Sequence, residues 1–177
     1  MTARALLAVA CLSAVVPVDA AAEVSLGVEA TVGADQLGLS RFPGSSEPIA
    51  AMGDLGAVVL LRLGSIGLGA SAEGSFDGLT LERFNASAMA GLVTDLLPVL
   101  RLELLAEVGI AELRSTAELR SRVSSDERDV FYGLRPGLSL KLPVLPVRVG
   151  AWGLARWGLP GTDGPALGLL GRVGVEF

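Results

Sequence analysis

The sequence predicts an all-β protein, an eight-stranded antiparallel up-and-down transmembrane β-barrel preceded by a cleavable signal peptide. Three observations lead to this prediction. After its first twenty-odd residues the chain alternates apolar and polar residues with a period of two. Charged residues fall on only one phase of that alternation. The connections between the alternating segments are short and long in turn, which is typical of barrels that cross a membrane.

The composition excludes several classes of protein. The chain has 177 residues, which favours one domain, and it is 51% hydrophobic with 23 glycines. Disordered chains have far fewer apolar residues. The formal net charge is −5, so the chain lacks the basic excess that nucleic-acid binding requires. Histidine is absent, which removes the usual general base and the commonest metal ligand. We therefore expect no nucleic-acid partner, no cofactor and no metal site.

Residues 1–20 have the features of a secretory signal peptide. Arg4 precedes a short apolar run, and small residues follow, so the cut is expected after Ala20 or Ala22. The alternative is a membrane anchor, which would need about 20 apolar residues. This run is interrupted at Pro17. Cleavage would also remove the only cysteine of the chain, and with it any disulfide or thiolate chemistry.

The barrel is expected to occupy residues 22–177. In its first strand, Val24 and Val28 fall on one phase of the alternation, and Glu23 and Glu29 fall on the other. Strict alternation of this kind indicates a strand with one apolar face. The same pattern recurs along the rest of the chain, and we predict strands at residues 22–33, 55–63, 66–76, 84–92, 100–110, 130–140, 147–157 and 167–177.

One phase of every predicted strand is free of charge, and the opposite phase carries acids and bases in similar numbers. A soluble barrel such as a lipocalin would turn the apolar phase inward. A membrane barrel turns it toward lipid and encloses the charges, which a small lumen tolerates as ion pairs. The balance of charge favours the membrane arrangement. The predicted lumen network comprises Glu23, Glu29, Arg62, Glu73, Arg101, Glu103, Glu107, Arg135, Lys141, Arg148, Arg156, Arg172 and Glu176.

The aromatic residues also favour a membrane barrel. Phe76, Phe84, Tyr132 and Trp157 lie on the apolar phase, and the order of the hairpins brings them to one rim. Aromatic rings gather at membrane–water interfaces, so we predict that these four form a girdle. The alternative is that they are ordinary aromatic residues of a soluble core.

The connection lengths point to short periplasmic turns and longer extracellular loops. The tight connections are expected at 63–66, 93–99 and 141–146, and the longer ones at 34–54, 77–83, 111–129 and 158–166.

The loop predicted at 111–129 contains a tandem repeat of six residues that starts at Ala111 and again at Ala117. The apolar phase changes here, from even at Ile110 to odd at Leu113. A bulge, a short helix or strands that project beyond the membrane would each produce this change. The loop is either a solvated charged segment or a docking surface for a partner at the cell surface.

Two pairs of polar residues are candidates for catalysis, and neither is favoured. Ser139 and Lys141 are two apart on one strand face, as a serine–lysine pair requires, but lumen-facing polar residues need no catalytic role. Glu103 and Glu107 share a face yet lie about 13 Å apart along a strand. This separation exceeds that of the two glycosidase carboxylates. We predict no catalytic residues.

The signal peptide, the alternating hairpins and the C-terminal strand resemble those of the small eight-stranded bacterial outer-membrane β-barrels, the OmpA-like and OmpX-like group. The last strand ends in Phe177, with Val173 and Val175 alternating before it. In this family such a strand is similar to the signal that the outer-membrane assembly machinery reads. The resemblance implies the outer membrane of a Gram-negative-type bacterium as the location and its lipid bilayer as the surroundings.

Three functions are compatible with this prediction. The leading interpretation is a non-enzymatic outer-membrane protein with a structural or surface-interaction role, whose lumen is filled by ion pairs. The alternative is a narrow channel, or a conduit or binder for a small apolar ligand, because Val58, Leu105, Trp152 and other apolar residues fall on the lumen phase. An enzyme acting on lipid or peptide is the third. Known barrel enzymes resemble this chain in fold, but they generally rely on histidine.

Overall fold

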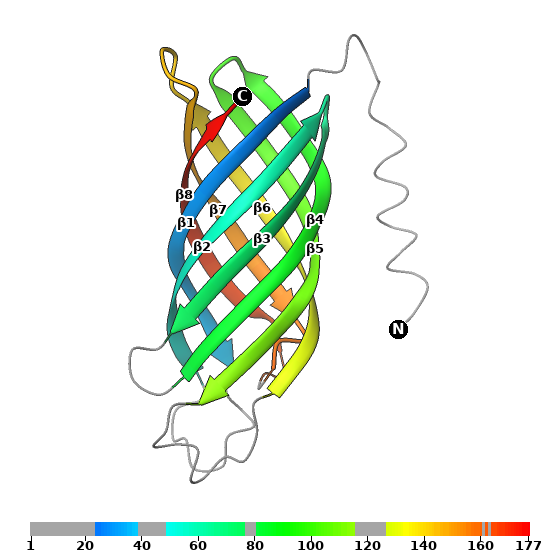
Figure 1. Ribbon diagram of the computed structural model, residues 1–177, viewed down its shortest axis with the longest axis vertical. Coiled ribbons are helices and arrows are strands. Elements are labelled where there is room, and N and C mark those ends of the chain that lie inside the picture. The colour runs from blue at the N-terminus through cyan, green and yellow to red at the C-terminus, as the bar shows by residue number, and fades with distance from the viewer. Residues whose placement is uncertain (1–23, 39–48, 77–80, 116–126, 161, 163) are drawn as a thin grey trace.

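The protein is a closed barrel of eight antiparallel strands (Figure 1). The computed structural model describes the whole chain except residues 1–23, 39–48, 77–80, 116–126, 161 and 163. Each strand pairs with its neighbours in the chain, and the first pairs with the last. The strands are β1 (Val24–Gly38), β2 (Ile49–Leu63), β3 (Ile66–Phe76), β4 (Leu81–Leu97), β5 (Leu100–Ser115), β6 (Glu127–Lys141), β7 (Val147–Trp157) and β8 (Ala166–Glu176). The predicted eight-stranded antiparallel barrel is confirmed, and the signal peptide stays a prediction.

The strands point apolar side chains outward and most polar side chains inward. In β1, Val32 is 64% exposed and its neighbour Thr31 is 1% exposed. In β6, Leu134 is 43% exposed and Arg135 is fully buried. Successive side chains of a strand point to opposite faces, so the period of two in the sequence becomes an apolar outer wall around a charged interior. Among the described residues, no helix is long and apolar enough to cross a membrane.

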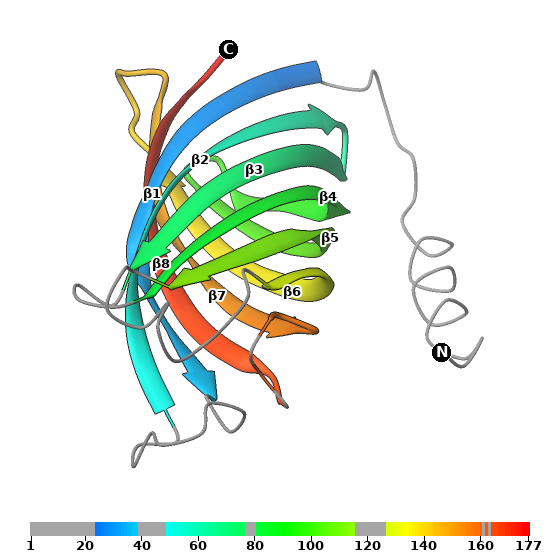
Figure 2. The same cartoon turned by 60° about the horizontal axis from the view of Figure 1, so that its bottom comes forward.

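The two ends of the barrel differ. At one end, which we call the short-turn end, tight connections join β2 to β3, β4 to β5 and β6 to β7. β1 begins at this end and the chain finishes there (Figure 1). The barrel closes where Phe177 N donates to Leu26 O at 2.9 Å and Leu26 N donates to Phe177 O at 3.0 Å. The other ends of the strands lie at the opposite end of the barrel, which we call the long-loop end and which Figure 2 brings forward.

The strands extend farther toward the long-loop end than the sequence pattern predicted. The predicted loop 111–129 was too long, because β5 continues to Ser115 and β6 begins at Glu127. The β5–β6 pairing runs to Leu113 without a shift of register. The change of phase at Leu113 is therefore neither a bulge nor a helix. It marks strands that project past the apolar wall. The second copy of the hexad lies outside the described residues.

Candidate functional site

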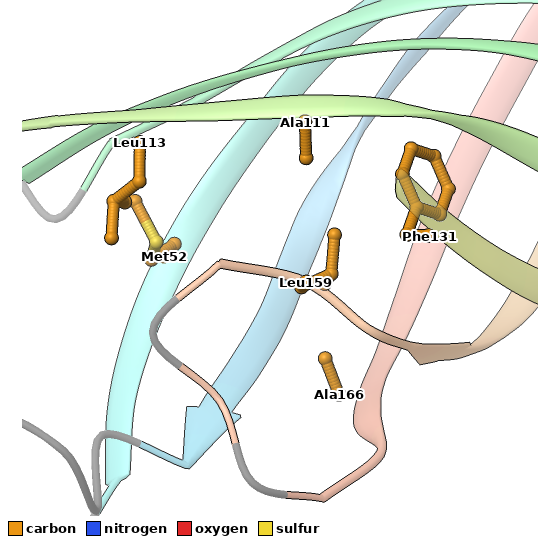
Figure 3. Packing of buried hydrophobic residues seen from close by; sticks show 6 residues of the cluster. All are labelled: Met52, Ala111, Leu113, Phe131, Leu159 and Ala166. Carbon is orange, nitrogen blue, oxygen red and sulfur yellow. The ribbon is translucent and has the colours of Figure 1, made fainter. Parts of the chain in front are cut away.

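A cluster of buried apolar side chains, which we call the apolar cap, lies inside the barrel at the long-loop end. Its side chains come from four strands and from the connection that follows β7 (Figure 3). At this end of the barrel the charged side chains point outward, which is the reverse of the rest of the wall. Glu112 and Arg114 lie on the outside and form an ion pair of 2.7 Å. A strand end that stands in water buries its apolar side chains and exposes its charges. The cap consists of Met52, Ala111, Leu113, Phe131, Leu159 and Ala166.

The connection between β7 and β8 is bent into the barrel mouth. Gly158 has a φ of +79°, a conformation that favours glycine. A Cβ added there would lie 2.9 Å from the backbone oxygen of Val130. The next residue, Leu159, is buried in the cap. Thr162 donates to Leu159 O from its backbone N at 3.2 Å and from Oγ1 at 2.9 Å, which holds the connection over the opening.

Below the cap lies a buried ion cluster around Arg83. Its Nη2 donates to Asp35 Oδ2 and lies 2.9 Å from Ser75 Oγ. Asp54 Oδ1 lies 3.5 Å from the same nitrogen. The three charged residues were missed because the predicted strands stopped at 33 and began at 55 and 84. Each lies on the polar phase of its strand, one or two residues beyond the predicted end. Predicted strands that were longer by one or two residues would therefore have included them.

The middle of the barrel contains a square of two carboxylates and two guanidinium groups, which we call the central cluster. Arg135 Nη2 is 2.6 Å from Glu73 Oε1, and Arg135 Nε is 2.7 Å from Glu107 Oε2. Arg156 bridges the same two carboxylates, with Nη2 2.5 Å from Glu73 Oε2 and Nε 2.7 Å from Glu107 Oε1. All four side chains are buried. The square is electrically balanced, which a buried ion cluster requires.

A second layer of ion pairs is built around Trp152. Arg172 donates to both oxygens of Glu103, with Nη1 2.6 Å from Oε2, the two-bond geometry that a guanidinium favours. Trp152 Nε1 donates to Glu103 Oε2 at 3.0 Å. The guanidinium of Arg172 lies 4.1 Å from the centre of the Trp152 ring, close enough for a cation–π contact. Glu29 Oε2 is 3.4 Å from Arg172 Nη1.

The apolar side chains of the lumen pack against one another beside these ion pairs. A Cβ on Gly137 would lie 2.2 Å from the Trp152 ring, so this glycine makes the room that the ring occupies. Near Glu29 and Leu60 the interior has a cavity of about 10 Å³, room for about one water molecule. The apolar group comprises Val58, Leu60, Met89, Val93, Leu105 and Trp152.

A chain of ion pairs crosses the short-turn mouth. Asp95 Oδ2 accepts from Arg62 Nη1 at 2.5 Å, and Asp95 Oδ1 accepts from Arg101 Nε at 2.8 Å. Arg101 Nη1 continues the chain to Glu176 Oε1 at 2.9 Å, and Arg148 Nε donates to Glu176 Oε2. Asp95 was missed because the predicted fourth strand stopped at 92. Lys141 lies exposed at this mouth, and Glu23 lies outside the described residues.

The predicted girdle residues lie on the outer wall. Phe76, Phe84 and Tyr132 are exposed. Trp157 is opposite Tyr132 on β7, and the two rings stack with centroids 5.8 Å apart. In the last strand, Val173 and Phe177 are also exposed. These positions are compatible with a girdle and an outward-facing C-terminal signal, and both stay predictions.

In each of the two candidate catalytic pairs, the two residues have different surroundings. Ser139 Oγ donates to Glu103 Oε1 at 3.4 Å, while Lys141 lies at the mouth. Glu103 and Glu107 bind different arginines. Within the part of the chain that the structure describes, no group of three possible ligands could hold a metal ion. The inward carboxylates are therefore engaged as ion-pair partners.

Comparison with known proteins gives relatives in structure only. No family model matches the chain, and no curated protein matches it. The structure is similar to Neisserial surface protein A, with a TM-score of 0.63 and 14% identity over 89% of this chain and 100% of that chain. It is also similar to the N-terminal β-barrel domain of Pseudomonas aeruginosa OprF, with a TM-score of 0.60 and 17% identity over 86% and 97% of the two chains.

A third similar structure is Ail, the attachment invasion locus protein of Yersinia pestis. Its TM-score is 0.54, with 16% identity over 89% of this chain and 100% of that chain. Identities at this level show the fold alone. The chain described here has the fold of the small eight-stranded outer-membrane β-barrels.

Proposed function

We propose that this protein is a non-enzymatic outer-membrane barrel of a Gram-negative-type bacterium, with a structural or surface-interaction role. The observation that carries the proposal is the inverted wall, with apolar side chains such as Val32 and Leu169 exposed outside and ion pairs such as Glu73–Arg156 buried inside. An exposed apolar belt of this extent would be unstable in water, whereas lipid accepts it and excludes charge.

The packed interior supports a role outside the lumen. The apolar cap, the Arg83 cluster, the central cluster and the layer around Trp152 follow one another along the barrel axis. An eight-stranded barrel is just wide enough for its own side chains. The alternative of a conduit for an apolar ligand is not favoured, because Val58, Leu105 and Trp152 pack against one another.

The long-loop end is the part of the molecule best suited to a partner. β5 and β6 project past the apolar wall there and carry the charged segment 116–126. Loops on a rigid scaffold often carry binding. The structurally similar Ail was crystallised in complex with the heparin analogue sucrose octasulfate. By analogy, we propose that segment 116–126 contacts a partner at the cell surface.

The C-terminal strand is the proposed signal for the outer-membrane assembly machinery. Val173, Val175 and Phe177 alternate on its outward face. Val173 and Phe177 are exposed on the outer wall, whereas the neighbouring Arg172 is buried in the lumen. A strand whose apolar side chains face outward can be recognised before the barrel closes.

The location is tested by fractionating cells that express the full chain and running unheated and heated samples on a gel. We expect the protein in the outer-membrane fraction, with a folded form that migrates differently until it is boiled. A precursor that shortens at Ala20 or Ala22 would support the signal peptide. Recovery of the mature protein from the soluble fraction without detergent would contradict the proposal.

The surface role is tested by adding trypsin to intact cells. Segment 116–126 contains arginines, so we expect cleavage there while the barrel remains folded. A variant in which both arginines of the segment, Arg120 and Arg122, are replaced by glutamine is the control and should resist cleavage at these sites. If intact cells protect the segment and broken cells do not, the loop faces the periplasm and the proposed orientation is wrong.

A further inference from the structure

We propose that the short-turn mouth of the barrel binds a phosphate-type oxyanion between Lys141 and Arg148. The mouth is hollowed into a bowl with a volume of about 320 Å³. This volume lies within the usual range of small-ligand sites, about 300–1,000 Å³. The proposal concerns the opposite end of the molecule from segment 116–126, so it stands or falls separately from the proposed surface role.

The bowl carries an excess of positive charge. Its cationic side chains are Arg62, Arg101, Lys141 and Arg148, and its carboxylates are those of Asp95 and Glu176 and the terminal carboxylate of Phe177, so the cations outnumber the carboxylates by four to three. The central cluster, by contrast, matches each guanidinium with a carboxylate. The excess at the mouth is therefore a local feature of the bowl. It is the sign of charge that would hold an anion.

The two side-chain carboxylates of the bowl have no oxygen left for Lys141. Asp95 uses Oδ1 for Arg101 and Oδ2 for Arg62. Glu176 uses Oε1 for Ser25, at 2.6 Å, and for Arg101, and it uses Oε2 for Arg148. Lys141 makes no ion pair with any residue that the structure describes, and an ammonium group offers three donors. Lys141 therefore keeps its donors free of the described side-chain carboxylates, and Arg148 uses only Nε for Glu176.

Lys141 also lies directly opposite another cation. It pairs with Arg148 in the β6–β7 register, so the two side chains leave the same face of neighbouring strands. Like charges at directly opposite positions destabilise an antiparallel pair. An oxyanion placed between them would turn this repulsion into two charge-assisted hydrogen bonds, since phosphate accepts from both guanidinium and ammonium groups.

The phosphate group that we propose as the ligand has two possible sources. A soluble phosphate group could enter the open bowl, or the phosphate of a phospholipid headgroup could reach it from the leaflet at this end of the barrel. Both would contact Lys141 and Arg148 through phosphate oxygens. They differ in whether the site is occupied in phospholipid vesicles without added phosphate.

The first experiment measures inorganic phosphate binding by calorimetry to the folded protein in a phosphate-free, uncharged detergent. We expect saturable binding that weakens at least tenfold in Lys141→Gln. Arg128→Gln is the matched control, because Arg128 is an exposed cation at the other end of the same strand, β6. It should bind phosphate as the wild type does. Equal loss in both variants would show an unspecific effect of net charge and would overturn the proposal.

The second experiment uses the fact that Lys141 is the only lysine in the sequence. Acetylation with an amine-specific reagent, followed by mass spectrometry, reports the accessibility of this one side chain. In vesicles of an uncharged galactolipid, which contains no phosphate, we expect added phosphate to slow acetylation of Lys141 severalfold if the ligand is soluble. Slow acetylation in phosphatidylglycerol vesicles without added phosphate would identify a headgroup instead. Equal rates under all three conditions would overturn the proposal.

Glu23 provides a further check, because it adjoins Val24 in the chain and lies outside the described residues. We expect Glu23→Gln to leave both the acetylation of Lys141 and the binding of phosphate unchanged. If the Glu23 carboxylate occupied the bowl, this substitution would speed acetylation of Lys141 and strengthen phosphate binding. That result would assign the site to Glu23 and overturn the proposal for an external anion.

Discussion

At the scale of single residues, the barrel interior depends on matched pairs. In the central cluster each arginine bridges both Glu73 and Glu107. Transferring an unpaired charge into a protein interior is strongly unfavourable, whereas a paired and hydrogen-bonded one is tolerated. The stability of the barrel should therefore respond to whether a substitution leaves a charge unmatched.

Removing one arginine of the central cluster should destabilise the barrel strongly. We expect Arg156→Gln to lower the free energy of unfolding by about 3–5 kcal/mol, because it leaves buried carboxylate charge uncompensated. Urea unfolding of the protein in lipid vesicles, followed by tryptophan fluorescence, measures this. The exposed Arg114→Gln is the control and should change it by about 0–1 kcal/mol.

Restoring the charge balance should recover part of this loss. Arg156→Gln combined with Glu107→Gln is expected to be more stable than the sum of the single changes predicts, with a coupling of about 0.5–3 kcal/mol. Strict additivity would show that the two side chains do not act as a pair.

For one carboxylate of the Arg83 cluster, we expect that removal of the charge does not destabilise the barrel. Neither oxygen of Asp54 accepts a hydrogen bond from the described residues, while Asp35 contacts Arg83 directly. We expect Asp54→Asn to leave the urea midpoint unchanged or raised. Asp35→Asn should lower the free energy of unfolding by about 1–3 kcal/mol, because it weakens a charged hydrogen bond. The reverse order of stability would contradict the assigned pairing.

At the scale of the elements, the strands change character along their length. Within the apolar wall they turn charge inward, and at the long-loop end β5 turns Leu113 inward and Arg114 outward. The same strand thus changes from an apolar outer face to a charged one along its length. The connection after β7 then places Leu159 in the opening, so the cap depends on a loop as well as on strands.

The bend at Gly158 should be sensitive to any side chain. Gly158→Ala puts an L-residue at positive φ, which costs about 1–2 kcal/mol, and brings Cβ close to the backbone of β6. We expect faster hydrogen exchange at residues 159–166 with the barrel strands unaffected. Gly164→Ala is the control on the same connection, because a Cβ there meets no atom within 4 Å. Equal exchange in the two variants would mean that the bend does not hold the cap.

At the scale of the whole molecule, the barrel is closed at several levels along its axis. The cap, the central cluster and the mouth are made of different residues. Opening one level therefore leaves the others in place.

We expect no large, stable conductance from the purified protein in planar bilayers. Leu159→Ala, which thins the cap alone, should behave in the same way because the ion-pair layers below remain. A large conductance in the wild type would contradict a closed lumen. A conductance that arises only in Leu159→Ala would show that the cap by itself seals the barrel.

The sequence alone determined the number of strands, their order and which face of each is apolar. It could do so because side chains alternate faces with a period of two, so one slip of register would bury or expose an entire set. The tertiary structure decided which charges meet. Glu73 pairs with Arg156 from a strand 83 residues away, and such contacts depend on barrel closure and on side-chain length, neither of which has a local signal. It also decided where the strands end, because Asp35, Arg83 and Leu113 lie beyond the segments in which the predicted pattern of apolar and polar residues applies.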